Sequence, residues 1–482
     1  MNKRMILYIL GVLLLCEAGL MVLPLLVDLL YHEGVFSSYI ITIAILSVAG
    51  LIMTRFKKEN KTIHARDGFM VVSLGWILLS LFGALPYFLS GEIPNYVDAV
   101  FETVSGLTTT GASILTDVEA LSHANLFWRC FTHWIGGMGV LVFIMAVLPL
   151  AGGGGDLYLM KAESPGPDVG KLVPKSISTA RILYGIYISM TIIEMILLII
   201  GGMPLFDSIA LSFATAGTGG FAVLNSSIES YNPYLQSVIT IFMALFGVCF
   251  NVYFLIICGK FKDAFKSEEL KAYFGIMFSA IVIISFDIRN YFGTAFESFR
   301  HAAFQVSSIM TTTGFSTTDF DKWPDLSRTI LVILMCIGAC AGSTGGGIKV
   351  SRILIAIKNV RRELKHLIHP RGVSVVKFDG KKINDEIVQS TNVFLYLYAV
   401  ILAVSVLLVS FDHVDLLSNF TGVISMLSNI GPGLAAVGPT GNFSVYTWFS
   451  KCVFISDMLL GRLEIFPLLL LFSHRPKSRK SV

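Results

Sequence analysis

The chain alternates long apolar runs with shorter apolar pieces and polar connecting segments. About 20 apolar residues are enough for a helix to cross the hydrocarbon core of a bilayer. The pattern therefore predicts ten membrane spans, at residues 5–30, 37–55, 68–90, 124–150, 181–201, 233–259, 271–288, 327–360, 391–410 and 444–472. Because this number is even, both termini are expected on the same side of the membrane.

Four apolar pieces are too short to cross a bilayer, and each of them lies between two full spans. We expect re-entrant half-helices at residues 95–108, 205–215, 296–310 and 414–427. An uncharged segment that contains glycine follows each half-helix: loop 1 (107–113), loop 2 (216–221), loop 3 (311–315) and loop 4 (428–433). This recurrence indicates four copies of one unit, made of a first span (M1), a pore helix, a loop and a second span (M2).

The expected fold is an all-α membrane protein with four M1–pore helix–M2 repeats around a central pore, plus two extra N-terminal transmembrane helices. The apolar run at the N-terminus is longer than the core of a signal peptide and lacks a small-x-small cleavage site, so we expect it to remain as the first span. The expected segments are an N-terminal helix pair (1–60), pore repeat 1 (61–160), pore repeat 2 (161–265), pore repeat 3 with a gating loop (266–375) and pore repeat 4 (376–482).

Composition supports membrane insertion. Hydrophobic residues make up 54% of the 482 residues and charged residues only 14%, and the mean hydropathy is +0.74. A soluble chain of this length carries more charge. The seven cysteines lie scattered in apolar runs, so no disulfide or zinc site is expected.

The distribution of charge predicts the orientation. Lysine and arginine gather near both ends of the chain and in segments 55–66, 161–181, 260–271 and 349–382, whereas the opposite loops are acidic. Basic loops remain in the cytoplasm, which places both termini there and opens the four loops to the exterior. Within the basic part, residues 373–383 resemble a hairpin with a tight turn at Asp379-Gly380. This hairpin is either a solvated loop or a docking surface for a soluble partner.

The four loops are expected to form a cation filter. Irregular backbone at membrane depth is tolerated where it is buried in protein or lines an aqueous path. Glycine allows carbonyl oxygens to turn toward an axis, and converging loops then replace the water around a cation. The loops contain no acidic residue, so carbonyl and threonine oxygens would bind a weakly hydrated monovalent cation rather than calcium. Close helix packing alone would explain one such loop but not four.

Three motifs make the chain similar to a known superfamily: His133–Gly139, Gly342–Lys349 and Ser428–Gly433. Together they resemble the TrkH/KtrB/HKT superfamily of potassium transporters, and the likeness runs over nearly the whole chain. The additional N-terminal helix pair is similar to the TrkH branch, since the KtrB branch has only the four units.

This resemblance implies potassium uptake across the bacterial cytoplasmic membrane, with K+ as the transported ion and no organic cofactor bound by this chain. It also implies a homodimer that sits on a TrkA-type cytoplasmic nucleotide-binding ring. The alternative within transport is a sodium-permeable or proton-coupled symporter. An intramembrane enzyme is disfavoured, because His133 stands alone and the Ser343-Thr344 pair has no nearby base in the sequence.

The resemblance also assigns the filter residues. The carbonyl-bearing positions are Thr109, Thr110, Gly217, Thr218, Thr312, Thr313, Asn429 and Ile430, followed by Gly111, Gly219, Gly314 and Gly431. Family members with serine in place of the first glycine tend to pass sodium, so Gly111 favours potassium. Loops 2 and 4 depart from the Thr-Thr-Thr-Gly pattern, which leaves room for weaker selectivity than in a potassium channel.

Two gate elements are expected beneath the filter. A glycine-rich break interrupts the long span of repeat 3 and is either a kink or, by resemblance, a gating loop made of Gly342, Ser343, Thr344, Gly345, Gly346 and Gly347. Lys349 either contacts this loop or marks the cytoplasmic edge. Arg462 in the last span either pairs with Asp457 or Glu464 or, by resemblance, projects into the pore and repels cations. Glu194 receives no role from the sequence.

Overall fold

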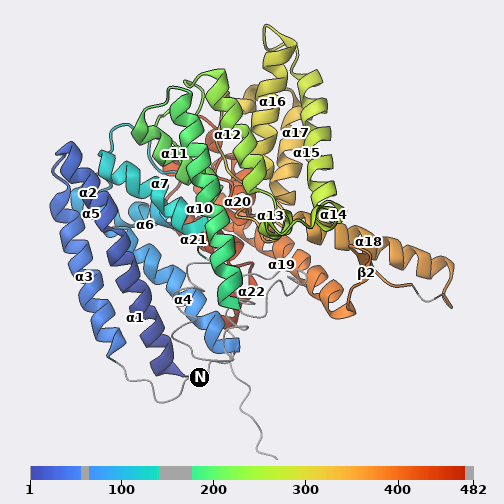
Figure 1. Cartoon of the computed structure of the whole chain (residues 1–482), viewed down its shortest axis with the longest axis horizontal. Coiled ribbons are helices and arrows are strands. Elements are labelled where there is room, and N and C mark those ends of the chain that lie inside the picture. The colour runs from blue at the N-terminus through green and yellow to red at the C-terminus, as the bar shows by residue number, and fades with distance from the viewer. Residues whose placement is uncertain (1, 56–64, 138, 140–175, 373, 473–482) are drawn as a thin grey trace, which may run out of the picture.

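The computed structural model describes residues 2–55, 65–137, 139, 176–372 and 374–472. Within this part the chain is almost entirely helical, with one two-stranded hairpin between β1 (Lys377–Phe378) and β2 (Lys381–Lys382) (Figure 1). The hairpin and its turn at Asp379-Gly380 are as predicted, although the strands are shorter than expected. The end of the predicted span at 124–150 lies almost wholly outside the described residues.

An N-terminal helical pair lies at the edge of the molecule (Figure 1). It consists of α1 (Lys3–Leu20) with its continuation α2 (Val22–Tyr31), and of α3 (Phe36–Thr54). Gly11 and Gly50 face each other, and a Cβ atom on either would lie 2.8 Å from the carbonyl oxygen of the other. Small residues therefore allow these two spans to pack closely, as is usual between membrane helices.

Among the described residues, six apolar helical segments are long enough to cross a membrane, namely Lys3–Tyr31, Phe36–Thr54, Arg66–Ser90, Ile182–Ile200, Glu268–Asp287 and Asp385–Asp412. These are the N-terminal pair and the M1 spans of the four repeats, as predicted. The M1 helices are α4 (Ala65–Gly83) with α5 (Leu85–Ser90), α10 (Ser176–Ile200), α15 (Glu268–Asp287) and α19 (Asp385–Val409).

The four pore helices are α6 (Tyr96–Leu107), α11 (Leu205–Gly217), α16 (Ala295–Met310) and α20 (Leu416–Ser428), close to the predicted bounds. Their first turns are well defined by side-chain caps in three cases. Asn95 accepts a hydrogen bond from the N–H of Val97, Asp415 accepts one from the N–H of Ser418, and Thr294 forms a capping box with Glu297.

The M2 spans of repeats 2, 3 and 4 are each divided into two helices. They are α12 (Pro233–Phe246) with α13 (Phe250–Ile257), α17 (Asp325–Ile337) with α18 (Val350–Ile368), and α21 (Trp448–Arg462) with α22 (Phe466–Phe472). The M2 span of repeat 1 contains α7 (His123–Gly137), and the rest of its predicted length lies almost wholly outside the described residues. The break in repeat 3 was predicted. The predicted spans at 233–259 and 444–472 are not continuous helices, and α12 and α13 differ in direction by 91°.

The bend between α12 and α13 has a tertiary cause. The carbonyl of Gly247 accepts a hydrogen bond from the N–H of Cys340 at 3.1 Å, and the N–H of Phe250 donates to the carbonyl of Gly342 at 3.0 Å. Backbone groups freed by the bend are therefore satisfied by the interrupted segment of repeat 3, which a buried helix break requires.

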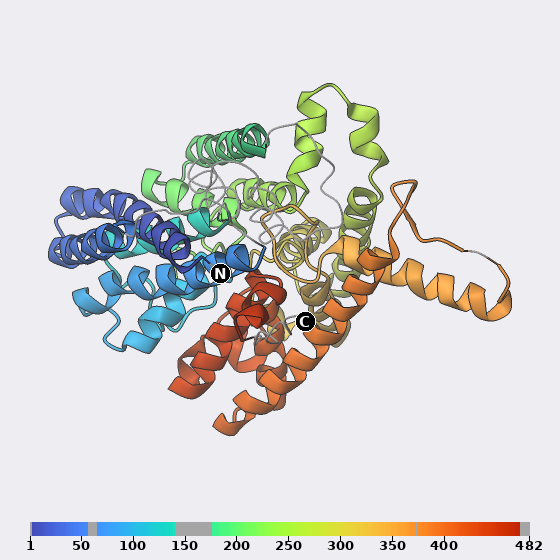
Figure 2. The same ribbon diagram turned by 90° about the horizontal axis from the view of Figure 1, so that it is seen from below.

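The repeats follow one another around a common centre (Figure 2). The M2 helix of each repeat packs on the pore helix of the next, so that α7 contacts α11, α12 contacts α16, α17 contacts α20 and α21 contacts α6. Helix α18 and the hairpin after it extend to one side of this bundle (Figures 1 and 2). The short helices α14 (Phe261–Lys266), η1 (Phe320–Lys322), η2 (Ser410–Asp412), η3 (Ala435–Val437) and η4 (Phe443–Val445) complete the connections.

Candidate functional site

All four loops leave their pore helices along the same backbone path. In each loop one N–H bonds back to the carbonyl five residues earlier, at 2.8 Å for Thr110–Ser105, Gly219–Ala214 and Thr313–Ser308 and at 3.0 Å for Ile430–Ser425. The preceding residue has a positive φ, which is uncommon for residues with a side chain: 55° at Thr109, 54° at Thr218, 60° at Thr312 and 55° at Asn429. The four loops therefore have a common register.

This register corrects loop 2 by one residue. In the structure, Thr218, Gly219 and Gly220 are equivalent to Thr109, Thr110 and Gly111 of loop 1. The sequence predicts that Gly217, Thr218 and Gly219 are the equivalent residues, one position earlier. Gly217 is the last residue of α11. The register is ambiguous in the sequence because loop 2 has two adjacent glycines. The structure gives a reason for each: a Cβ atom on Gly219 would lie 2.2 Å from the ring of His133, and Gly220 has a φ of 82°.

The loops touch one another in a closed ring. A Cβ atom would lie only 1.8 Å from the Gly219 carbonyl oxygen if placed on Gly111, and 2.0 Å from that of Thr313 if placed on Gly220. The same construction on Gly314 meets the Ile430 carbonyl oxygen at 2.0 Å, and on Gly431 it meets that of Thr110 at 2.8 Å. Loop 1 thus contacts loop 2, loop 2 contacts loop 3, loop 3 contacts loop 4, and loop 4 returns to loop 1. Only glycine allows this approach.

The loop hydroxyl groups are engaged with other protein groups. Thr110 and Thr313 bond to the hydroxyls of Thr108 and Thr311 at 2.8 and 2.7 Å, and those two hydroxyls bond in turn to carbonyls of their own helices at 2.6 and 2.7 Å. Asn429 donates to the Thr110 hydroxyl at 3.0 Å, which ties loop 4 to loop 1. The groups that remain for a ligand are mainly backbone carbonyls. Among the described residues no group of three or more His, Cys, Asp or Glu side chains could hold a metal ion.

The interrupted segment between α17 and α18, residues 338–349, lies directly against this ring, and we call it the intramembrane loop. The N–H of Gly346 donates to the Thr312 hydroxyl at 2.6 Å. A Cβ atom on Gly345 would lie 2.8 Å from the carbonyl oxygen of Thr311, and one on Gly346 would lie 2.2 Å from that of Ser428. The intramembrane loop therefore contacts loops 3 and 4 on the side where the pore helices end.

The candidate gating residues of this segment are held on several sides. Gly342 and Gly347 have φ values of 74° and 77°, and Ser343 donates to the carbonyl of Cys340 at 2.7 Å. The Thr344 hydroxyl donates to the carbonyl of Phe246 at 3.3 Å. Lys349 is buried and its ammonium group donates to the Gly345 carbonyl. Of the two alternatives for Lys349, the structure has the contact with the loop.

Arg462, the last residue of α21, connects three segments of the chain. Its guanidinium group donates to the Thr109 hydroxyl at 3.2 Å, to the Thr344 carbonyl at 3.0 Å and to the Gly136 carbonyl. These partners belong to loop 1, the intramembrane loop and the end of α7. Glu464 forms an ion pair with Arg352, and Asp457 accepts a hydrogen bond from Ser405 at 2.7 Å.

Comparison with known proteins identifies the family. Residues 32–283 and 291–482 match the TrkH family, described as cation transport proteins. The chain belongs to the TrkH family. It is therefore a transporter rather than an enzyme, as its motifs led us to expect.

The TrkH relatives match the chain over nearly its whole length. It is 37% identical over 481 residues to the Trk system potassium uptake protein TrkH of Escherichia coli (strain K12), covering 98% of this chain and 99% of the relative. It is 34% identical over 479 residues to the Trk system potassium uptake protein TrkG of the same strain, covering 98% of each. The crystal structure of the potassium transporter TrkH from Vibrio parahaemolyticus superposes with a TM-score of 0.87 at 34% identity, covering 98% of this chain and 99% of that one. The predicted helical membrane fold is confirmed.

One residue that contacts the intramembrane loop of this TrkH family member was not predicted from the sequence. Glu269, in the first turn of α15, is 8% exposed. Its Oε1 atom accepts hydrogen bonds from the N–H of Ala341 at 2.7 Å and of Ser351 at 3.0 Å. Glu269 thereby holds both ends of the intramembrane loop. In the sequence it follows the cap residue Ser267 as an ordinary first-turn acid, so nothing distinguished it.

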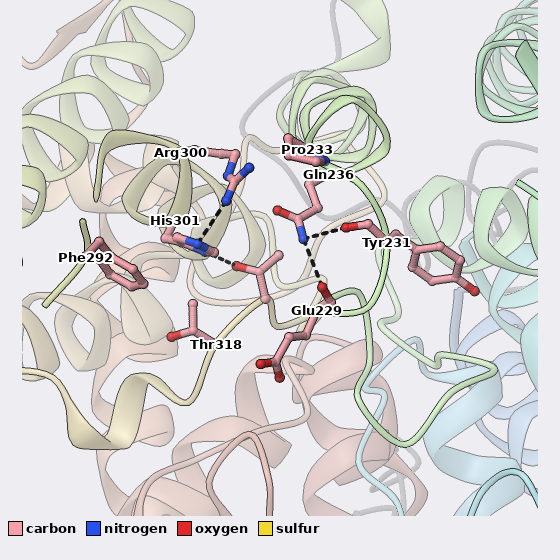
Figure 3. A pocket seen from close by; sticks show the side chains of 9 residues that line it. Glu229, Tyr231, Pro233, Gln236, Phe292, Arg300, His301 and Thr318 are labelled. Atoms are coloured by element: carbon pink, nitrogen blue, oxygen red, sulfur yellow. Dashed lines mark hydrogen bonds between the residues drawn. The ribbon is translucent and has the colours of Figure 1, made fainter. Parts of the chain in front are cut away.

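A hollow of about 310 Å³ lies between the outer segment of repeat 2, the pore helix of repeat 3 and the segment that leaves loop 3 (Figure 3). His301 lies in it between Arg300 and Thr317, at 3.3 Å and 2.9 Å, and its ring stacks on Phe292. The Gln236 amide donates to backbone carbonyls of repeat 2 (Figure 3). None of the predicted site residues lines this hollow.

Glu194, which has no role assigned from the sequence, is fully buried in α10. Its carboxylate oxygens have no hydrogen-bond partner within the described part of the chain.

Proposed function

We propose that this protein takes up potassium across the bacterial cytoplasmic membrane through the ring formed by loops 1 to 4. The closed ring of loops is the observation that carries the proposal, because glycine faces carbonyl at each of its contacts. Backbone carbonyls can replace the hydration shell of K+. The loops carry no negative charge, which the binding of a divalent ion would require. The relatives are named as Trk system potassium uptake proteins, which supports the same ion.

In this proposal the filter consists of Thr109, Thr110, Gly111, Thr218, Gly219, Gly220, Thr312, Thr313, Gly314, Asn429, Ile430 and Gly431, with Gly217 immediately before it. The pore helices end at the ring, so the negative ends of their dipoles are directed toward a bound cation. K+ would lose most of its water on entering the ring and regain it on leaving.

We further propose that the intramembrane loop and Arg462 close the pathway beneath the ring. The loop contacts loops 3 and 4, and Arg462 contacts loop 1, so together they lie under three of the four loops. The fixed positive charge of Arg462 raises the energy of a cation that leaves the ring. The Lys349 contact with Gly345 and the Glu269 contacts hold the loop in this position.

Regulation would come from outside the chain. By family resemblance, two copies would pair and sit on a TrkA-type cytoplasmic nucleotide-binding ring, with both termini on that side. Helix α18 and the β1–β2 hairpin extend from the bundle and carry many lysine and arginine residues, which suits docking to an acidic soluble partner (Figure 1). A sodium-permeable or proton-coupled symporter is the alternative, favoured only by the departure of loops 2 and 4 from the Thr-Thr-Thr-Gly pattern.

Rubidium and sodium uptake into proteoliposomes tests the proposal. The unaltered protein should take up Rb+, a substitute for K+, in clear preference to Na+. Gly111→Ser places a Cβ atom 1.8 Å from the Gly219 carbonyl oxygen, so loop 2 must move. We expect the Rb+/Na+ uptake ratio to fall about tenfold, the equivalent of about 1.4 kcal/mol.

Gly91→Ser is the matched control. Gly91 has a similar φ of 78° but no atom within 4 Å of the position that a Cβ would take. It therefore shares the backbone strain of the Gly111 variant without its contact in the ring. Equal Rb+ and Na+ uptake by the unaltered protein, or an equal effect of the two serine variants, would contradict the proposed filter.

A further inference from the structure

Three buried side chains of repeat 1 lie behind the contact between loops 1 and 2. They are Glu102 on α6 and Arg129 and His133 on α7, which are 0%, 3% and 0% exposed. We call them the buried cluster. None of them belongs to the proposed filter or gate, yet each reaches a segment that enters or leaves loop 1 or loop 2.

Glu102 holds the chain that leaves loop 1. Its carboxylate accepts hydrogen bonds from the Ser113 hydroxyl at 2.9 and 3.1 Å and from the N–H of Ile114 at 3.1 Å. It also accepts a bond from the Arg129 Nε at 2.6 Å. The segment immediately after Gly111 is therefore attached to a negative charge inside the bundle.

Arg129 holds the chain that leaves loop 2. Its Nη1 donates to the carbonyl of Ala222 at 2.9 Å, and its guanidinium carbon lies 3.6 Å from the centre of the Phe221 ring. The Glu102–Arg129 ion pair therefore joins the exits of two neighbouring loops. A buried ion pair contributes little net stability compared with apolar packing, so its value lies in the geometry that it fixes.

His133 joins the entrance of loop 1 to the end of loop 2. Its Nδ1 lies 2.9 Å from the carbonyl oxygen of Gly106, which can only accept, so this nitrogen carries a hydrogen. Its Nε2 lies 3.2 Å from the N–H of Phe221, which can only donate, so this nitrogen is unprotonated. The neutral ring thus sets the distance between the end of α6 and loop 2, and it occupies the space that a side chain at Gly219 would need.

The charged residue is specific to one repeat. In the common register, the residue eight positions before the backbone-bonded loop residue is Glu102 in repeat 1. The equivalents in the other repeats are Leu211, Gln305 and Gly422. A carboxylate behind the ring is thus found at only one of these four positions.

We propose that Glu102, Arg129 and His133 are positioning residues that fix the separation of loops 1 and 2 and thereby set the discrimination between potassium and sodium. The proposal rests on the proposed function of the ring. Carbonyl oxygens distinguish two ions of equal charge only if their number and spacing around the ion are held. Loosening one contact of the ring should let it adapt to the smaller ion, and Na+ uptake should rise relative to Rb+ uptake.

Glu102→Gln tests this proposal because it keeps the size of the side chain and removes its charge. We expect the Rb+/Na+ uptake ratio in proteoliposomes to fall about tenfold, since a charged, buried hydrogen-bond acceptor is lost. Arg129→Lys keeps the charge but lacks the planar fork that reaches both Glu102 and Ala222, so its ratio should fall as well. The control is Asp263→Asn, which removes an exposed carboxylate on α14 and should leave the ratio unchanged.

The possible outcomes separate the two proposals. If the unaltered protein does not distinguish Rb+ from Na+, the proposed filter fails. If it does, but Glu102→Gln and Arg129→Lys lower both fluxes equally and leave the ratio unchanged, the cluster is merely structural and the inference is overturned. Should Glu102→Gln fail to fold, Arg129→Lys decides by the same ratio. A lowered ratio in that variant supports the inference, and an unchanged ratio overturns it.

Discussion

The contact between loops 1 and 2 and the contact between loops 2 and 3 are alike in the ring but differ behind it. In both, a glycine meets a carbonyl of the next loop. Behind loops 1 and 2 lies the buried cluster, with a charged pair at 2.6 Å. Between the segments that leave loops 2 and 3 lies the hollow of about 310 Å³, which no residue of either loop lines (Figure 3). There the exit of loop 3 is held by neutral bonds, from the N–H of Ser316 to the Ser227 hydroxyl at 3.2 Å and from the N–H of Ile228 to the Ser316 carbonyl at 3.0 Å.

This difference indicates which contacts of the ring can be displaced and which cannot. Tightly packed, fully bonded surroundings resist displacement, whereas atoms beside a hollow have room to move. We infer that the ring is stiff between loops 1 and 2 and more adaptable between loops 2 and 3. An asymmetric ring of this kind is a consequence of building four loops from one chain, because each repeat can carry its own supporting side chains.

The largest effect is expected from breaking the charged pair. Arg129→Leu leaves the Glu102 carboxylate buried without its cation, which should lower the free energy of unfolding by about 3–5 kcal/mol. Arg300→Leu removes an arginine from the wall of the hollow, where it is half-buried and contacts His301 at 3.3 Å. This second change should cost about 1 kcal/mol or less. Denaturant unfolding in detergent measures both, and equal losses would contradict the contrast between the two contacts.

Much of this arrangement could be predicted from the sequence, because its signals are local. The length and hydropathy of the short apolar pieces predict the half-helices, and the glycines that follow predict the loops. The register of loop 2 was missed, because the side chain that requires Gly219 is His133 from another repeat. The bend at Gly247 was missed for the same kind of reason, since its bonding partners lie in the intramembrane loop.

The supporting residues were the hardest to find. Glu102, Arg129 and Glu269 look like ordinary polar positions at the ends or on the faces of helices. Their importance comes from partners that are distant in the chain, as with Arg129 and Ala222 or Glu269 and Ala341. Hydrophobic periodicity carries no information on such pairs. The family motifs did include His133, but they did not state which atoms it joins.

An intermediate effect, on the rate of Rb+ uptake, is expected from removing the positive charge beneath the ring. Arg462 contacts loop 1, which is on the stiff side, and Lys349 holds the intramembrane loop that lies under loops 3 and 4. Arg462→Ala removes a positive charge from the proposed exit, and we expect Rb+ uptake to rise about tenfold, as for a barrier lowered by about 1.4 kcal/mol. Arg462→Lys keeps the charge and serves as the control. Unchanged uptake by Arg462→Ala, at equal amounts of protein in the vesicles, would count against the charge as a barrier.

The smallest effect is expected from filling the hollow. Thr318 lines it and is half-buried, so Thr318→Ile adds bulk where space exists and should change stability by about 0.5 kcal/mol or less. If loops 2 and 3 adapt to the smaller ion because of this free space, a larger side chain should restrict them. The Rb+/Na+ uptake ratio should then rise by up to about twofold, corresponding to a few tenths of a kcal/mol. Thr318→Ser, which removes a methyl group, should lower the ratio or leave it unchanged. A fall with isoleucine as large as that expected for Glu102→Gln would show that the hollow supports the ring as firmly as the buried cluster does, and the contrast would be lost.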